Sequence, residues 1–375
     1  MYKVGIIGGG QLGKMMILDG KRLDTQFYIL DPTERCPADS IADGHIVADF
    51  NDIDAIIKMA DGVDVVTNEF EHISVPALKK LEGMGYKVYP SSETLRLIQN
   101  KLTQKQWLKK HDIPVPEFLP VGSVEELYEA GEKFGYPMML KTCTGGYDGK
   151  GNAQVGSKEE VQEAYEALGA GKLPLMVEHW IDFEKEVSIL ACRSANGEMA
   201  VFPVAENRHK NSILDETTVP AAISDASAKE AMEVARTTLA AFDVVGMLCI
   251  ELFVTKQGHI LVNELAPRPH NSGHYTIEAC YTSQYENHVR AILGLPLGNP
   301  DLIGPVAMKN IIGDRNGTAE LTGLEEAYSL PNVKVHIYGK EQVKKGRKMG
   351  HITAMGKTVE EALASVRKAH EVLGI

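Results

Sequence analysis

Residues 137–154 read PMMLKTCTGGYDGKGNAQ, and this stretch decides the fold that we expect for the chain. Its apolar start predicts a short buried strand that ends at Lys141, whose charge is costly to bury unless an anion meets it. The loop that follows contains four glycines, which free the backbone to approach a ligand and to expose its N–H groups. The stretch therefore predicts a glycine-rich lid over phosphate groups, and hence nucleotide chemistry.

Length and composition limit the classes of protein that fit this lid. A chain of 375 residues predicts two or three domains, and 44% hydrophobic with 24% charged residues is typical of a globular protein. The net charge of −12 argues against a nucleic-acid partner. The first residues lack a signal-peptide pattern, no apolar run is long enough to span a membrane, and the five cysteines are scattered. We therefore expect a cytoplasmic protein without a membrane partner.

A second glycine-rich turn lies near the N-terminus, where GGGQLGKMM (8–16) follows an apolar strand at 3–7 and precedes a helix. Strands alternate with helices from there to about residue 100, which predicts a parallel α/β domain. With Asp31 the motif resembles a dinucleotide fingerprint, whereas Met15 stands where a P-loop needs Ser or Thr. The glycines can also simply permit a tight turn. We favour a helix N-terminus that binds one phosphate of a small substrate.

Two carboxylates mark an expected hairpin between residues 247 and 265. A two-residue turn at Lys256–Gln257 would pair Glu251 with Val262 and put Glu264 diagonally beside Glu251, roughly 7–8 Å away. Two like charges on one face repel unless a cation joins them, and magnesium prefers such oxygen ligands. Two acids on a solvated face are the alternative, and a bulge would change the pairing.

Directly after the hairpin, the loop RPHNSGH (268–274) supplies Arg268, His270 and Asn271. These side chains could hold a small oxyanion such as bicarbonate. An ordinary polar loop explains the same residues equally well.

Taken together, these residues resemble the ATP-grasp superfamily and, within it, the 5-(carboxyamino)imidazole ribonucleotide synthases of purine biosynthesis. The resemblance covers essentially the whole chain. Its most specific stretches are GIIGGGQLGKMM (5–16), TNEFEHI (67–73), NELAPRPHNSGHYTIEAC (263–280) and GRKMGH (346–351).

The resemblance implies an α/β and α+β architecture, namely an ATP-grasp fold with an N-terminal parallel α/β domain and a C-terminal extension. The implied domains are 1–100 for the substrate phosphate, 101–183 for the small ATP-grasp domain with its lid, and 184–375 for the large domain with the extension. It also implies a homodimer.

By resemblance, the cofactors are ATP and Mg²⁺, with Glu251 and Glu264 as the metal ligands. The nucleotide would contact Lys101, Lys141, Gly146, Tyr147, Asp148, Gly149, Lys150, Gly151, Asn152, Glu178, His179, Trp180, Ile181, Glu186, His209, Asn263 and Glu264. Lys101 and Lys150 stand where many relatives have arginine, which keeps the charge but loses the bidentate fork.

The implied reaction joins bicarbonate to the amine of aminoimidazole ribonucleotide through carboxyphosphate, with release of ADP and phosphate. The implied catalytic residues are Lys141, Asp148, Arg268, His270 and Asn271. The implied ribonucleotide contacts are Gly10, Gln11, Leu12, Glu69, Glu71, Tyr147, Asp148, Lys150, Arg268, Lys340 and Arg347. The last two belong to a basic tail that is suited to a phosphate in a protein of this acidity; its members are Lys340, Lys344, Lys345, Arg347 and Lys348. The rival hypotheses are another ATP-grasp carboxylase or ligase, an NAD-dependent oxidoreductase and a catalytically inactive binding protein.

Overall fold

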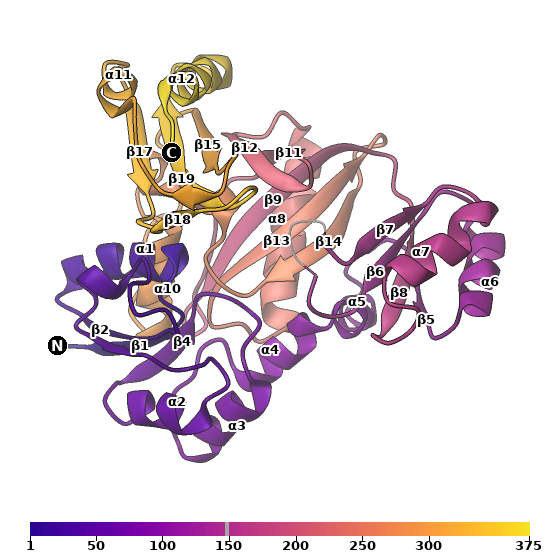
Figure 1. Cartoon of the computed structure of the whole chain (residues 1–375), viewed down its shortest axis with the longest axis horizontal. Helices are drawn as coiled ribbons and strands as arrows, with labels where there is room; N and C mark the ends of the chain where they lie inside the picture. The colour runs from indigo at the N-terminus through magenta and orange to yellow at the C-terminus, as the bar shows by residue number, and fades with distance from the viewer. Residues whose placement is uncertain (147–149) are drawn as a thin grey trace.

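The computed structural model describes residues 1–146 and 150–375. In Figure 1 an N-terminal sheet lies at the lower left, a small sheet at the right, and a large sheet between them, with the C-terminal elements at the upper left. Among the described residues, no helix is long and apolar enough to cross a membrane.

The N-terminal sheet has the strand order β3-β2-β1-β4, and its neighbours run parallel. This confirms the predicted parallel α/β arrangement. The same alternation predicts a further strand at residues 86–89, but this segment forms an isolated parallel bridge between Val66 and Val88 and no full strand. The elements of this part are β1 (Lys3–Ile7), α1 (Gln11–Gly20), β2 (Gln26–Leu30), β3 (Gly44–Ile46), α2 (Ile53–Ala60), β4 (Val65–Asn68), α3 (Val75–Gly83) and α4 (Ser92–Gln99).

Helix α5 (Lys101–Lys110) connects this part to the small sheet, whose antiparallel strand order is β5-β8-β6-β7. Asn100 begins α5 by accepting a hydrogen bond from the Thr103 N–H, as a good N-cap does. The strand that was predicted to end near Lys141 is β6, and the glycine loop connects it to β7. The small-sheet elements are β5 (Phe118–Val121), α6 (Val124–Phe134), β6 (Met138–Thr142), β7 (Asn152–Val155), α7 (Val161–Ala167) and β8 (Leu175–His179).

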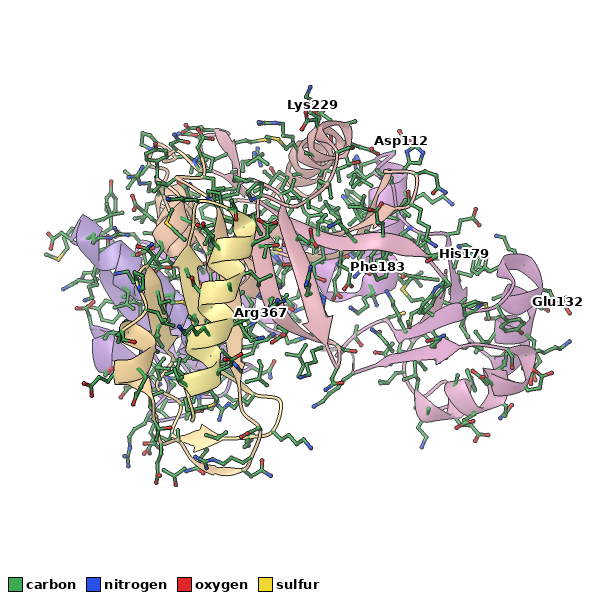
Figure 2. The ribbon with its side chains drawn as sticks, turned by 90° about the horizontal axis from the view of Figure 1, so that it is seen from above. Asp112, Glu132, His179, Phe183, Lys229 and Arg367 are labelled. Carbon is green, nitrogen blue, oxygen red and sulfur yellow. The ribbon has the colours of Figure 1, made fainter. Side chains whose placement is uncertain are left out.

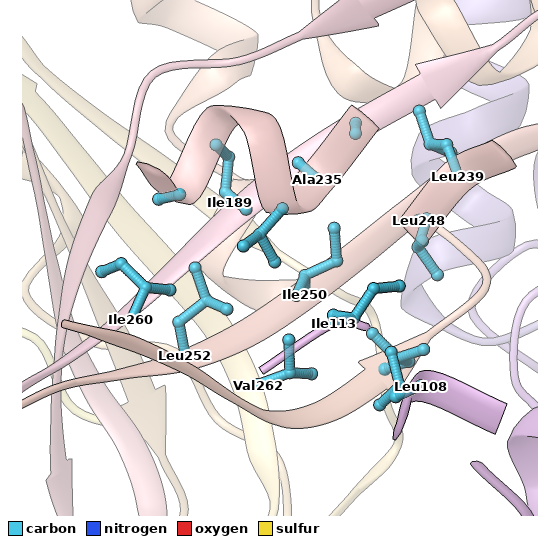
Figure 3. Close-up of a cluster of buried hydrophobic side chains, with 14 of the residues drawn as sticks. Leu108, Ile113, Ile189, Ala235, Leu239, Leu248, Ile250, Leu252, Ile260 and Val262 are labelled. Atoms are coloured by element: carbon cyan, nitrogen blue, oxygen red, sulfur yellow. The ribbon is translucent and has the colours of Figure 1, made fainter. Parts of the chain in front are cut away.

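The large sheet has the strand order β14-β13-β9-β11-β12-β15-β19-β17, with β10 paired to β9. Its main core lies between β9, β13, β14, helix α8 and the end of α5, as Figure 3 shows for Leu108, Ile250 and Val262. The elements are β9 (Phe183–Arg193), β10 (Met199–Val201), β11 (Ala205–Lys210), β12 (Ile213–Val219), α8 (Asp225–Ala241), β13 (Gly246–Thr255) and β14 (Ile260–Ala266).

The C-terminal part adds strands to the same large sheet and covers them with helix α12. Ala362, Val366 and Ala369 form the buried face of α12 against these strands. The remaining elements are α9 (Thr276–Ala279), α10 (Gln284–Ile292), β15 (Val306–Ile312), β16 (Gly317–Thr318), α11 (Leu324–Tyr328), β17 (Val333–Ile337), β18 (Gln342–Val343), β19 (Lys348–Met355) and α12 (Val359–Val372).

Candidate active site

A cavity of about 690 Å³ is lined by residues of the small and the large sheet, together with residues of helix α1 and of the segment after β4. Most of the residues predicted from the sequence line it: Gln11, Leu12, Glu69, Glu71, Lys101, Lys141, Gly146, Lys150, Asn152, Glu178, His179, Trp180, Ile181, Glu186, His209, Glu251, Asn263, Glu264, Arg268, His270 and Asn271. The predictions for Tyr147, Asp148 and Gly149 lie outside the described residues.

The two carboxylates of the hairpin face each other directly. Glu251 on β13 pairs with Glu264 on β14, whereas Leu252 pairs with Val262, so that Asn263 is the extra residue of a β-bulge. The turn is also one residue longer than predicted, because the Thr255 N–H reaches the His259 carbonyl and Gly258 has a φ of +84°. The prediction that Glu264 lies diagonally beside Glu251 was therefore wrong, because the register of the hairpin differs. The prediction that both carboxylates lie on one face of the hairpin is confirmed.

This pair of carboxylates has the chemistry of a cation site. Burial, and then the charge of Glu264, raise the pKa of Glu251 to about 7. Lys101 forms an ion pair with Glu264. Among the described residues no group of three or more His, Cys, Asp or Glu could hold a metal. A pair of carboxylates fits magnesium, which takes one or two protein carboxylates together with phosphate oxygens.

Lys141 is fixed by partners on both walls of the cavity. Its Nζ lies 2.7 Å from Glu178 Oε2 on β8 and 3.4 Å from Asn263 Oδ1 on β14. Lys105 Nζ lies 3.1 Å from the other oxygen of Glu178, and sequence reasoning missed this residue. Burial acts to raise the pKa of Glu178, but Lys105 and Lys141 outweigh it and lower this pKa to about 2. The Glu178 carboxylate, which by resemblance would contact the nucleotide, lies between these two lysines.

The connection from β8 to β9 provides the apolar end of the cavity, and Figure 2 shows His179 and Phe183 there. The rings of Phe183 and Phe253 stack with centroids 4.7 Å apart and an interplanar angle of 10°. Neither phenylalanine was predicted as a site residue. Phe183 lies two residues after the expected contact Ile181, and Phe253 lies within the expected hairpin. Such stacked rings suit the flat apolar face of a base.

Glu186 and His209 close this end with a contact of 2.8 Å between Glu186 Oε2 and His209 Nδ1. Burial acts to lower the pKa of His209, but the hydrogen bond and charge of Glu186 outweigh it, so the pKa is raised.

Arg268 and His270 line the cavity beside the carboxylate pair. Arg268 makes a two-pronged ion pair with Glu71, with Nε–Oε2 at 2.6 Å and Nη2–Oε1 at 3.2 Å. Burial acts to raise the pKa of Glu71, but Arg268 outweighs it and lowers this pKa to about 2. Glu71 thus fixes Arg268 in place.

His270 is a neutral ring directed at the carboxylate pair. Burial, and then the charge of Arg268, lower its pKa well below the usual value. Its Nδ1 accepts from the Ser272 backbone N–H at 3.3 Å, so the proton lies on Nε2, 3.4 Å from Glu251 Oε1.

Asn271 has a different environment from the one expected. Its side-chain amide forms two reciprocal hydrogen bonds with Asn310 on β15, at 2.9 and 2.6 Å, and it is buried. Asn310 thus takes one of the two N–H donors of this amide, and the expectation that Asn271 holds an oxyanion stays a prediction.

The N-terminus of α1 also has an internal partner. Glu69 accepts hydrogen bonds from the N–H groups of Gly10 at 2.5 Å and Gly13 at 2.7 Å. A Cβ atom on Gly10 would lie 2.5 Å from Glu69 Oε1, so glycine is required for this close approach. These two amides are therefore not free to bind a substrate phosphate, and phosphate binding by the other amides of this helix N-terminus stays a prediction. Gly10 does not line the cavity; Gln11 and Leu12 do.

The basic tail contributes a residue other than those predicted. Lys340 Nζ donates to the Lys348 carbonyl at 2.7 Å, and Arg347 Nη1 donates to the Gln342 carbonyl at 2.9 Å. Of the tail residues, Lys348 lines the cavity, and Lys340 lines a separate one of about 450 Å³. Neighbouring residues of a strand point to opposite faces of the sheet. This alternation was the signal in the sequence that could have distinguished Lys348, at the start of β19, from its neighbour Arg347.

Family models match three parts of the chain. Residues 106–285 match the ATP-grasp domain, residues 1–99 match a ribonucleotide synthetase preATP-grasp domain, and residues 306–365 match a phosphoribosylaminoimidazole carboxylase C-terminal domain. The N5-carboxyaminoimidazole ribonucleotide synthase of Bacillus subtilis (strain 168) is 41% identical over 363 residues, which are 97% of this chain and 94% of the relative. The chain belongs to the N5-carboxyaminoimidazole ribonucleotide synthase family.

Solved structures agree with membership of the N5-carboxyaminoimidazole ribonucleotide synthase family. The Thermotoga maritima synthetase is 43% identical, with a TM-score of 0.90 over 100% of this chain and 99% of that one. An Aspergillus clavatus synthase in complex with ADP and 5-aminoimidazole ribonucleotide is 37% identical, with a TM-score of 0.90 over 99% of this chain and 98% of that one. The ATP-grasp fold expected from the sequence is thereby confirmed, and the chain is an ATP-dependent ligase of this family.

Proposed function

We propose that this protein uses ATP and bicarbonate to carboxylate the amine of 5-aminoimidazole ribonucleotide, in purine biosynthesis. The observation that carries the proposal is one cavity in which two groups of anion-binding side chains lie side by side. Lys101 and Lys141 lie beside the pair Glu251–Glu264, and Arg268 and His270 adjoin the same pair, with His270 Nε2 3.4 Å from Glu251 Oε1. A phosphate donor and a small oxyanion bound by these two groups would lie next to each other.

The nucleotide would lie between the small and the large sheet. Phe183 and Phe253 would face the base, and Glu186 with His209 would hold the ribose. Lys101 and Lys141 would hold the phosphates. Glu251 and Glu264 would hold magnesium, which when bound neutralises phosphate charge and orients the transferred group. Lys150 and the predicted lid residues Tyr147, Asp148 and Gly149 would cover the site.

The chemistry assigned to the protein is mainly positioning. A bicarbonate oxygen attacks the γ-phosphorus, the bond to the β-phosphate oxygen breaks, and ADP leaves carboxyphosphate behind. Arg268 offsets the negative charge of bicarbonate, and the neutral His270 donates a hydrogen bond to it. Carboxyphosphate then yields phosphate and carbon dioxide, whose carbon the substrate amine attacks as it loses a proton. Water must be excluded from this labile intermediate, which gives the lid its second role.

Glu69 and Lys348 would recognise the ribonucleotide, together with Gln11 and Leu12. The proposal keeps Asp148 as a candidate to orient the substrate amine. Dimerisation and a cytoplasmic location also belong to the proposal; all five cysteines are free and buried, which is compatible with a reducing compartment.

Purified protein should release ADP from Mg-ATP only when both 5-aminoimidazole ribonucleotide and bicarbonate are present. A coupled ADP assay with each component omitted in turn measures this dependence. No ADP release with the complete mixture would contradict the proposal. Thermal stabilisation by NADH but not by Mg-ATP would favour an oxidoreductase instead.

Replacing Lys348 with methionine should raise the KM for the ribonucleotide by roughly tenfold, because one cation that faces the substrate end is lost. The KM for ATP should change little. Steady-state kinetics with each substrate varied in turn measures both constants. Lys344→Met is the matched control, since Lys344 belongs to the same tail but is exposed. Equal effects of the two variants on the ribonucleotide KM would remove Lys348 from the site.

A further inference from the structure

Lys105 is a fully buried lysine to which neither a sequence motif nor the proposed reaction gives a role. It lies on α5 one helical turn after Lys101, and it is only 1% exposed. Its Nζ is 3.1 Å from Glu178 Oε1 and donates a hydrogen bond of 2.8 Å to the Val262 carbonyl. Burying an ammonium group is unfavourable without such partners. The positions of these two partners therefore indicate which parts of the site Lys105 supports.

The first partner connects Lys105 to the phosphate-binding lysine. Glu178 is 3% exposed and holds Lys141 through its other oxygen, at 2.7 Å. Two ammonium groups and one carboxylate give the cluster Lys105–Glu178–Lys141 a net charge of +1. Without Lys105, the pair Lys141–Glu178 would be neutral overall, and it would attract a phosphate far less in a partly buried site.

Lys105 remains charged at neutral pH in this environment. Burial lowers its pKa to about 8, against the charge of Glu178, which acts to raise it. Lys141 also lowers this pKa, and Glu264 raises it.

The second partner connects the same lysine to the opposite wall. Val262 precedes Asn263, which contacts Lys141 and is the bulge residue that brings Glu264 opposite Glu251. Lys105 therefore joins β8 of the small sheet to β14 of the large sheet. Leu108, one turn further along α5, packs with Val262 in the main core, which holds the helix in place (Figure 3).

We propose that Lys105 is a positioning residue for phosphoryl transfer: through Glu178 and the Val262 carbonyl it gives the cluster Lys105–Glu178–Lys141 its net positive charge and keeps Lys141 in register with the carboxylate pair. This inference rests on the proposed function for the identity of the donor, ATP. The lysine itself does not line the cavity.

The test compares Lys105→Met with Lys309→Met. Lys309 pairs with two carboxylates, Asp215 at 2.8 Å and Glu216 at 3.2 Å, and its side chain is 11% exposed, but it does not line the cavity. Lys105→Met should weaken Mg-ADP binding by about tenfold in calorimetry and lower kcat by roughly 10- to 100-fold. Adenosine binding should stay unchanged. Lys309→Met should change neither affinity nor kcat, even where it lowers the melting temperature.

The double variant Lys105→Met/Glu178→Gln separates charge balance from simple loss of packing. It restores a net charge of +1 through Lys141 alone, so it should recover most of the Mg-ADP affinity. The double variant keeps the proposal testable if the single variant Lys105→Met does not fold. Wild-type affinity in the single variant, or no recovery in the double variant, would overturn the proposal. Calorimetry with Mg-ADP does not depend on turnover, so a failure of the proposed carboxylation would be seen separately, as absent ADP release by the wild-type protein.

Discussion

Replacing Lys141 with methionine is expected to lower kcat for ADP release by on the order of 10³-fold, with a smaller effect on the KM for ATP. Negative charge builds up on the transferred phosphoryl group as the reaction proceeds, and Lys141 is the lysine with partners on both walls of the cavity. A side chain that offsets developing charge contributes more in the transition state than in the bound ground state, so its removal appears mainly in kcat.

Steady-state kinetics and a thermal melt of the same preparation check this expectation. Methionine keeps much of the length of lysine, and Glu178 keeps its contact with Lys105, so we expect the fold to survive. Lys309→Met serves again as the control for removing a buried ion-pair lysine. A kcat within threefold of wild type would exclude Lys141 from phosphoryl transfer.

Local patterns predicted much of this site. The strand before the glycine loop, the N-terminal parallel sheet and the hairpin were all visible as apolar runs bounded by turns. The residues that line the cavity were predicted largely through a family resemblance, because each motif taken alone allowed an unremarkable alternative. The domain boundaries at 100 and 183 stay predictions.

The errors arise where contacts between residues far apart in the sequence decide the register of a strand or the partner of a side chain. The bulge at Asn263 has no strong local signal, yet it changes which residue faces Glu251. Asn271 and Asn310 are far apart in sequence, so nothing in the RPHNSGH loop indicates that its amide already has a partner. Lys105 looks like any helix lysine until the Glu178 carboxylate is placed beside it.

Glu264→Gln is the second large expected effect, with kcat lowered by about 10²- to 10³-fold and the Mg²⁺ concentration for half-maximal activity raised. Glutamine keeps the size of the side chain but removes the charge that makes the Glu251–Glu264 pair a cation site. An amide oxygen is a weaker ligand for a hard cation than a carboxylate is. Titrating Mg²⁺ at fixed ATP should therefore show a weaker apparent affinity, and not only a lower plateau.

The expected stability of this variant makes the prediction specific to the metal. Glu264 lies opposite Glu251, and its charge acts to raise the pKa of Glu251, so the loss of this charge relieves repulsion in the metal-free protein. Lys101 can then pair with Glu251, whose charge already acts on it. We therefore expect a melting temperature near that of wild type without Mg-ADP, and a smaller rise when Mg-ADP is added. Glu206→Gln is the matched control, because Glu206 pairs with Lys185 at 2.7 Å on the same sheet but does not line the cavity. Near-normal kcat with an unchanged Mg²⁺ requirement would show that the carboxylate pair serves the hairpin and not the nucleotide.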